Sequence, residues 1–131
     1  MKTFTIYNIL TGEVKRIGSA PDNMVAIQAL DGEGIILNEM LDHDTQYIIN
    51  SIPTLRTEML TTINKLIISA DGIDVCVIQN IPLNTEIFIN DVFKGIELDG
   101  ITEISFDTLG IYNIKLVLFP YLNMEYIINA N

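Results

Sequence analysis

The sequence predicts an all-β protein with two β parts joined by one short helix, and three observations support this fold class. Isoleucine is the most frequent apolar residue, and β-branched side chains favour the pleated, half-buried surface of a sheet. Turn residues such as Asp-Gly recur roughly every eight to twelve residues after residue 65, a spacing typical of short antiparallel strands. With 131 residues, 49% of them hydrophobic, the chain is long enough for one ordinary domain or two small ones.

Residues 1–52 are predicted to form a small β module. Apolar and polar side chains alternate over residues 4–7, Thr11-Gly12 supplies a turn, and residues 13–17 return as a second strand. This pattern is typical of a β-hairpin. Further strands are expected at residues 24–30, 35–37 and 47–49, with turn or loop residues between them.

Residues 53–64 are predicted to form a helical connector between the two β parts. Leu55, Met59 and Ile63 recur at a spacing of four residues, which would place them on one face of a helix. Pro53 suits the first turn of such a helix, because the N–H that proline lacks has no intrahelical partner there. A helix of about three turns would need packing to hold it in place.

Residues 65–131 are predicted to form a small antiparallel β-sandwich, because short apolar runs alternate with turn signals. The strands are expected at residues 66–68, 75–78, 86–89, 93–98, 101–106, 111–119 and 124–128. The clearest alternation lies in the sixth of these segments. One face of that strand would carry Tyr112, Ile114, Leu116 and Leu118.

Tyr112 makes the predicted sandwich more specific. In immunoglobulin-like sandwiches, a Tyr near the start of a late strand stands two residues before a core position. Its hydroxyl forms a hydrogen bond to the backbone at the preceding corner. Here Tyr112 would be that tyrosine and Ile114 the core position. We therefore expect residues 65–131 to be immunoglobulin-like, with an ordinary strand that happens to contain a Tyr as the alternative.

The charge balance argues against two classes of partner. The chain carries 7 basic and 17 acidic side chains, a net charge of −10, and has no basic run. Nucleic-acid binding depends on Lys and Arg clusters that displace counterions from phosphates, so no nucleic-acid partner is expected. A membrane partner is not expected either, because an anionic surface would repel the chain and no apolar run is long enough to span a bilayer. The start lacks the apolar core of a signal peptide, which predicts synthesis in the cytoplasm.

The sequence predicts no catalytic residue, no metal ligand and no cofactor-binding residue, so neither an enzyme activity nor a cofactor is expected. The single histidine, His43, stands between Asp42 and Asp44, where a solvated turn is favoured over a metal site. The single cysteine, Cys76, lies in an apolar run, which favours a buried, inert thiol over a reactive one. No nucleophile elbow accompanies any serine.

Two acidic patterns leave alternatives open. Residues 71–74 and 90–91 could bind calcium at the end of a sandwich, but neither matches an EF-hand loop and both are typical turn residues. Paired carboxylates for glycoside cleavage could come from any two of the 17 acids. The absence of Trp makes an aromatic platform for a sugar unfavourable.

Several short motifs follow one another along nearly the whole chain. They are residues 4–8 and 11–18, Gln28-Ala29, Gly32-Glu33, residues 47–49, Ala70-Asp71-Gly72, Ile81-Pro82, Asp107 with Gly110 and Tyr112, and Phe119-Pro120-Tyr121. In this order they resemble a family of small tailed-bacteriophage proteins of similar length, often encoded near tail genes. The resemblance implies a tail-associated or other virion structural part with an immunoglobulin-like C-terminal half, and it implies no catalytic residues. The Ile- and Asn-rich composition departs from the family and is typical of an AT-rich genome.

Together these observations predict a non-enzymatic structural or assembly component of a bacteriophage particle, associated with the tail and located in the virion. The expected partners are other virion or tail proteins, in a symmetric oligomer or a larger assembly. Tyr7, Tyr121 and Tyr126 are the candidate partner contacts, because a Tyr ring is apolar and its tip is polar; core packing is the alternative for each. A carbohydrate- or cell-surface-binding adhesin module and a small hydrolase are the alternative functions.

Overall fold

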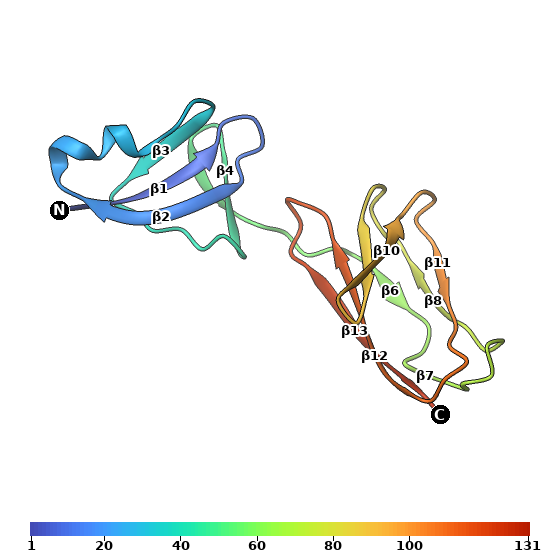
Figure 1. Cartoon of the computed structure of the whole chain (residues 1–131). Helices are drawn as coiled ribbons and strands as arrows, with labels where there is room; N and C mark the ends of the chain where they lie inside the picture. Colours follow the sequence, from blue (N-terminus) through green and yellow to red (C-terminus); the bar gives the residue numbers. More distant parts are fainter. The chain divides into compact units, whose positions relative to one another are not determined.

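The computed structural model describes all 131 residues and confirms a mostly β protein. Strands make up 48% of the chain and helices 5%. The chain divides into two compact units, Met1–Thr57 and Glu58–Asn131, each with its own group of strands (Figure 1). The boundary between the units lies inside the predicted connector rather than at either of its ends.

A three-stranded antiparallel sheet forms the centre of the first unit. Its strands are β1 (Lys2–Asn8), β2 (Val14–Ala20) and β3 (Glu33–Leu37), in the order β2-β1-β3. The predicted hairpin of β1 and β2 is confirmed, with Gly12 at a φ of 79° in the turn. A Cβ atom at Gly12 would lie 1.9 Å from the carbonyl oxygen of Ile48, so only glycine fits this position.

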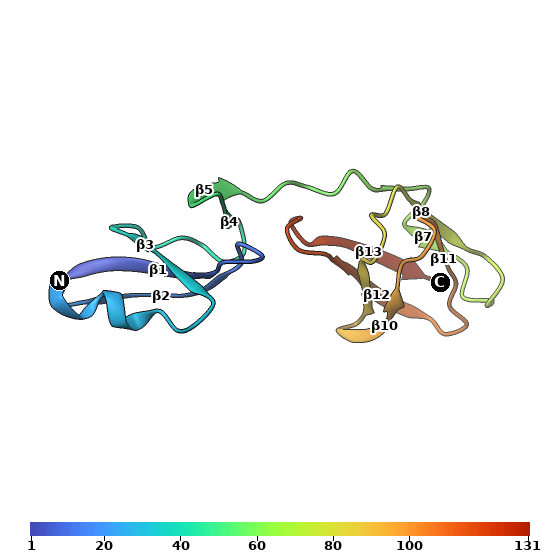
Figure 2. The ribbon, with the colours of Figure 1, turned by 90° about the horizontal axis from the view of Figure 1, so that it is seen from above.

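Both faces of this sheet are covered. One face carries a buried cluster of Phe4, Ile6, Ala20 and Val25, and the other a cluster of Val14, Leu41 and Ile48. The first cluster includes Val25, which lies between two 3-10 turns, η1 (Asp22–Met24) and η2 (Ala26–Gln28). The second includes a residue of the hairpin formed by β4 (Gln46–Ile49) and β5 (Ile52–Leu55). Figure 2 shows the 3-10 turns and this hairpin on opposite sides of the sheet.

Residues 24–30 do not form the predicted strand. They lie largely in the 3-10 turns, the first of which is closed by a hydrogen bond from the Met24 amide to the Pro21 carbonyl oxygen (2.8 Å). Val25 is 3% exposed and Ile27 is 68% exposed, so the alternation places only one apolar side chain in the core. Burial of Val25 against β1 therefore outweighs the strand preference of this segment.

The predicted helix over residues 53–64 is also wrong, and its first part is a strand. Pro53 lies in β5, directly opposite Ile48 of β4. The hairpin has only two strands, so β5 has an edge without a neighbouring strand, and such an edge tolerates a residue that lacks an N–H. Pro53 therefore marks an edge strand rather than the start of a helix.

The second part of the predicted helix fails because the chain crosses from one unit to the other. Residues 56–61 form no regular structure, and the next two residues form the first strand of the second unit. Leu55 is 70% exposed in the first unit, whereas Met59 is buried in the core of the second. The four-residue spacing thus joins an exposed side chain of the first unit to a core side chain of the second, and no common helix face exists.

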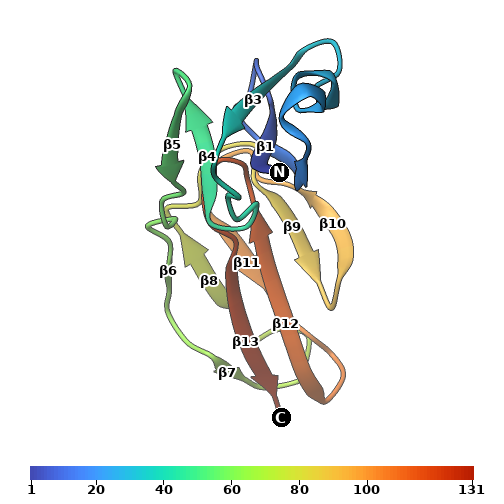
Figure 3. The same cartoon turned by 90° about the vertical axis from the view of Figure 1, so that its left-hand side faces the viewer.

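The second unit consists of two sheets that enclose one core (Figure 3). The larger sheet contains β7 (Ile67–Ile68), β9 (Glu86–Ile89), β10 (Val92–Ile96), β12 (Gly110–Val117) and β13 (Met124–Ala130), in the order β10-β9-β12-β13-β7. The smaller sheet contains β6 (Thr62–Ile63), β8 (Cys76–Gln79) and β11 (Thr102–Ile104), in the order β11-β8-β6. Only β7 and β13 pair in parallel. Each strand predicted after residue 65 overlaps one of these strands.

The predicted core face of β12 is confirmed. Ile114 and Leu116 are fully buried between the two sheets, and the half-buried Tyr112 packs against the same cluster. The Tyr112 hydroxyl donates a hydrogen bond to the backbone carbonyl oxygen of Thr108 over 2.8 Å. Its ring stacks on that of Phe106, with ring centroids 3.6 Å apart. The hydrogen bond of Tyr112 thus connects the turn before β12 to the strand. Such a bond to the backbone was expected for a Tyr two residues before a core position.

Candidate functional site

An open groove lies in the second unit where an edge of one sheet meets an edge of the other. Residues of β9, β10, β11 and the loop between β10 and β11 line it, and its volume is about 540 Å³. Because β10 ends the larger sheet and β11 ends the smaller one, each has an edge without a neighbouring strand. Ligand pockets in proteins measure about 300–1,000 Å³. The groove is therefore the candidate binding site of the chain.

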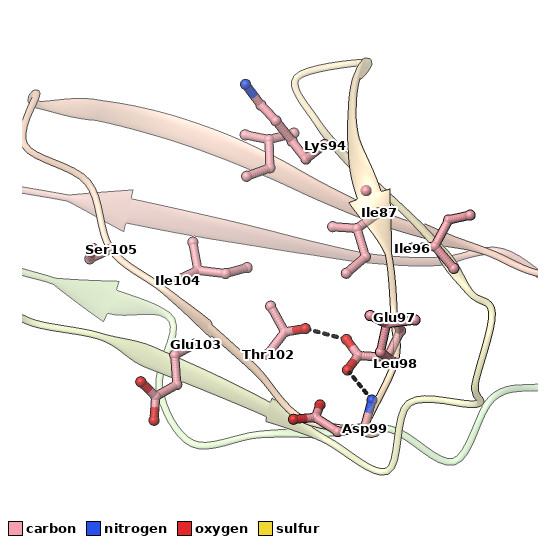
Figure 4. Close-up of a pocket in the computed structure, with 12 residues that line it drawn as sticks. Ile87, Lys94, Ile96, Glu97, Leu98, Asp99, Thr102, Glu103, Ile104 and Ser105 are labelled. Atoms are coloured by element: carbon pink, nitrogen blue, oxygen red, sulfur yellow. Dashed lines mark hydrogen bonds between the residues drawn. The ribbon is translucent and has the colours of Figure 1, made fainter.

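The floor of the groove is apolar. Ile87 and Ile89 of β9 and Ile104 of β11 line it while packing in or against the core. Side chains alternate along β11, so Ile104 points into the groove and the Glu103 carboxylate lies on the other side of the strand (Figure 4). Leu98, which is 82% exposed, also lines the groove. A partner side chain placed here would remove apolar surface from water.

Glu97 holds the loop at one end of the groove. Its side chain is only 4% exposed, and one carboxylate oxygen accepts hydrogen bonds from the amides of Gly100 (3.0 Å) and Asp99 (3.3 Å). The other oxygen accepts a hydrogen bond from the Thr102 hydroxyl, visible in Figure 4. The backbone of Glu97 forms hydrogen bonds with the backbone of residues 84–85. One buried carboxylate therefore connects the end of β10, the loop and β11.

The groove is acidic. The Ile101 amide donates a hydrogen bond to Asp99 Oδ1 (3.0 Å), and this bond lowers the pKa of the Asp99 carboxyl below its ordinary value. Glu97, Asp99 and Glu103 are the acidic lining residues, and Lys94 is the basic one. Because the Glu103 carboxylate lies on the other side of β11, the charged side chains left at the groove are Glu97, Asp99 and Lys94. Their net charge of −1 favours a partner with Lys or Arg.

Strand β10 has two features that oppose simple addition of another strand to its edge. The pairing register with β9 shifts between Phe93 and Gly95, which leaves Lys94 in a β-bulge. A bulge and an exposed lysine are common devices by which an edge strand avoids pairing with another chain. An occupant is therefore expected to fill the groove with side chains rather than to extend the larger sheet.

The three tyrosines predicted as partner contacts are half-buried, each against a core of its own unit. Tyr7 packs on the Val14–Leu41–Ile48 cluster, and its ring lies against Gly34. Tyr121 and Tyr126 pack on the core of the second unit, and the Tyr126 hydroxyl lies 2.6 Å from that of Thr61. None of the three lines the groove. Packing explains their burial, and a role in partner contacts stays a prediction.

Neither the single histidine nor the single cysteine lines the groove. In the first unit, His43 Nε2 is 3.6 Å from Glu13 Oε1, and its Nδ1 is 3.3 Å from Asp44 Oδ1. Cys76 is fully buried, as predicted, and burial raises the pKa of its thiol. His43 thus belongs to the first unit and Cys76 to the second.

The carboxylates of residues 71–74 are engaged within their own loop. Asp71 Oδ1 accepts hydrogen bonds from the amides of Ile73 and Asp74, both 2.9 Å long, and these bonds lower the pKa of Asp71. Asp74 pairs with Lys65 and accepts a hydrogen bond from the Ser69 amide (2.8 Å), and its pKa is lowered by both. Nowhere in the chain do three or more His, Cys, Asp or Glu side chains gather in a way that could hold a metal ion.

Neither Glu97 nor the groove was identified from the sequence. Glu97 is one of 17 acidic residues and lies in a segment predicted as strand, residues 93–98. The available signal was its position just before the Asp99-Gly100 turn, because a carboxylate beside a turn can accept hydrogen bonds from the turn amides. The groove itself depends on which strands end each sheet, and strand order cannot be obtained from spacing alone.

No protein-family model, curated protein or solved structure matches this chain. The structure also contains no helix with the length and hydrophobicity needed to cross a membrane.

Proposed function

We propose that this chain is a non-enzymatic structural or assembly component of a bacteriophage particle, associated with the tail and acting through protein–protein contacts. The groove between β10 and β11 is the surface that binds the partner. The observation that carries this proposal is an open groove with an apolar floor, flanked by two strand edges that have no neighbour. The phage setting rests on the resemblance of the motif order to small tailed-phage proteins.

The occupant in this proposal is an extended segment of another virion protein. Its apolar side chains would pack against Ile87, Ile89 and Ile104 on the floor. The net charge of the lining favours Lys or Arg beside those apolar residues, because complementary charge speeds encounter and selects the partner. The lining contains no aromatic ring, so it offers nothing on which a sugar could stack, and a protein segment suits it better.

An immunoglobulin-like fold of the second unit is part of the proposal. In such sandwiches strands B and E pair in one sheet, and strands C, F and G pair in the other. The neighbours β8 and β11, and the neighbours β9, β12 and β13, match these two sets in chain order. The hydrogen bond between Tyr112 and Thr108 supports the same assignment. A sandwich of this kind presents loops and edges on a rigid frame, which suits an assembly protein.

The distribution of exposed apolar side chains supports a role in assembly. Five large hydrophobic residues are exposed between residues 92 and 101, in β10 and the loop that borders the groove. They are Val92, Phe93, Ile96, Leu98 and Ile101. Single exposed apolar residues are normal on protein surfaces, but a concentration beside a groove is typical of an interaction site.

Peptide mass spectrometry on purified particles of the phage that encodes the chain tests its role in the particle. The expected result is its presence at a small, fixed ratio to the major capsid or tail protein. Absence from the particle, in spite of expression in infected cells, would contradict a structural role.

The groove is tested by photo-crosslinking in infected cells. A benzophenone amino acid replaces Leu98, which lines the groove, and in a matched control it replaces Leu109, which is 73% exposed outside it. The expected result is one crosslinked virion protein from position 98 and none from position 109. Equal crosslinking from both positions, or none from position 98 in cells that assemble particles, would show that the groove is not the binding surface.

A further inference from the structure

The outer face of the larger sheet carries more apolar residues than a solvent-facing sheet normally does. Ile114 and Leu116 of β12 point into the core, so the alternate residues of this strand point outward. The register places their partners on β13, β9, β10 and β7 on the same outer face. The apolar residues there are Ile67, Phe88, Phe93, Ile96, Ile111, Val117 and Ile127. An antiparallel sheet with one face on the core usually has polar residues on the other.

These apolar side chains form two neighbouring groups on the face, with Asn113, Lys115 and Glu125 between them. Ile67, Ile111 and Ile127 surround Asn129, and Phe88 lies beside Phe93. Ile67 is 62% exposed, Phe93 53%, Ile111 70% and Ile127 52%, and the four residues come from four of the five strands. Phe88, from the fifth strand, is the cross-strand neighbour of Phe93, and their rings meet edge to face with centroids 5.6 Å apart. Exposed apolar residues contributed by every strand of a sheet face are typical of an interaction site.

The same face is nearly neutral, although the unit around it is strongly acidic. Residues 58–131 contain ten acidic and three basic side chains. The register places only Glu86, Lys115 and Glu125 on the outer face, and Lys115 and Glu125 are direct cross-strand neighbours. The face thus has a net charge of −1, against −6 for the rest of the unit. It is the surface through which two copies of an acidic chain can approach with little repulsion.

We propose that two copies of this chain associate through this face, with the larger sheet of one packed against the larger sheet of the other. A twofold axis through the face places one apolar surface on its identical counterpart. It also brings Lys115 of each copy to the acidic residues of the other. The face meets the groove only along β10, where Ile96 borders both, and the proposal does not depend on the phage setting.

The dimensions of the face suit a stable dimer. Five strands about 4.8 Å apart span about 20–24 Å, and a strand of eight residues such as β12 extends about 26 Å. Specific interfaces cover about 800 Å² of accessible surface on each partner, and a pleated face of these dimensions reaches that order. Sheet-on-sheet packing at about 10 Å is an ordinary way for two such faces to meet.

Sedimentation equilibrium of the full chain, up to about 100 μM, tests the proposal. The expected result is a species of twice the 14.7 kDa chain mass. The double variant Ile111→Thr/Ile127→Thr keeps β-branched residues at both strand positions and is expected to raise the dimer Kd at least about tenfold. Ile73→Thr, at a residue that is 81% exposed in the loop of residues 71–74, is the matched control and is expected to leave Kd unchanged. A chain that stays monomeric, or a dimer that ignores the double variant, would overturn the proposal.

A second measurement uses the unaltered chain and so does not depend on the folding of a variant. Equal amounts of ¹⁴N- and ¹⁵N-labelled chain are treated with a lysine-reactive crosslinker, and links that join the two isotopes are identified by mass spectrometry. The proposal predicts a mixed-isotope link from Lys115 to Lys115. Mixed-isotope links confined to the lysines of the first unit, Lys2 and Lys15, would overturn it, as would their complete absence at a concentration where sedimentation detects the dimer.

Discussion

Glu97 is expected to be the acidic residue on which the stability of the second unit depends most. Its buried carboxylate is shared by three donors, the amides of Gly100 and Asp99 and the hydroxyl of Thr102. In Glu97→Ala all three lose their acceptor, at about 1 kcal/mol for each half-buried donor, or about 3 kcal/mol in all. For a unit the size of residues 58–131, each kcal/mol lowers Tm by about 4–8 °C, so the expected fall is about 12–24 °C.

Glu97→Gln separates hydrogen bonding from charge. The amide oxygen of glutamine can keep the bonds from the Gly100 and Asp99 amides, and its NH₂ group can donate to the Thr102 hydroxyl, which rotates to accept. What is lost is the extra strength of hydrogen bonds to a charged acceptor, about 1 kcal/mol. The expected fall in Tm is therefore about 4–8 °C, roughly a third of that for the alanine variant.

The assay must report on the second unit alone, because a chain with two compact units can unfold in two steps. A urea titration meets this requirement when unfolding is monitored by hydrogen exchange of peptides from residues 58–131. Glu103→Ala, an exposed glutamate on β11, is the matched control and is expected to cost less than about 0.5 kcal/mol. If Glu97→Ala were no more destabilising than Glu103→Ala, or Glu97→Gln as harmful as Glu97→Ala, the hydrogen-bonding role of this carboxylate would be refuted.

Three further predictions concern the corner tyrosine, the first hairpin and acid stability. Tyr112→Phe removes the hydrogen bond to Thr108 and should cost about 0.5–1 kcal/mol in calorimetry, since the freed carbonyl can bond to water; no change in Tm would argue against the bond. Gly12→Ala forces a Cβ against the Ile48 carbonyl at a positive φ, and should destabilise the first unit by at least about 2 kcal/mol in urea; an unaffected midpoint would contradict the tight turn. The lowered pKa of Asp74 means that this carboxyl stabilises the fold above its ordinary pKa of about 3.9 and loses that effect as pH falls below it. Asp74→Asn should therefore show a shallower loss of stability between about pH 5 and pH 2, and parallel curves would exclude this contribution.

The strands after residue 65 were predictable because local pattern and tertiary burial agree there, whereas β6, at residues 62–63, was predicted as helix. Alternation along β12 places Ile114 and Leu116 on the core side, and both are fully buried. The hydrogen bond of Tyr112 was predictable for the same reason, since the residue stands two positions before a core residue. Turn residues between short apolar runs were enough to locate every strand after residue 65, within a few residues at each end.

The segments that were wrongly predicted are those in which tertiary contacts decide the structure. Val25 and Ile27 alternate as in a strand, but only Val25 meets a core, and 3-10 turns provide that contact with fewer residues. Leu55 and Met59 have helical spacing, but they belong to different units. The same limit applies to the groove. It exists because β10 and β11 end their sheets, and strand order is a property of the whole fold.

The position of β13 in the larger sheet has a consequence for synthesis on the ribosome. This strand lies between β12 and β7, so the sheet cannot close until residue 130 has emerged. At about 5–20 residues per second, residues 58–131 follow the first unit by about 4–15 s. β12 ends at residue 117 and β13 at residue 130, so one edge of β12 has no partner for about 0.7–2.6 s of synthesis. Over that time Ile128 and Ala130 are missing from the core around Ile114 and Leu116. A high concentration of ribosomes making this chain would therefore favour pairing between neighbouring nascent chains, in the seconds before each chain supplies its own last strand.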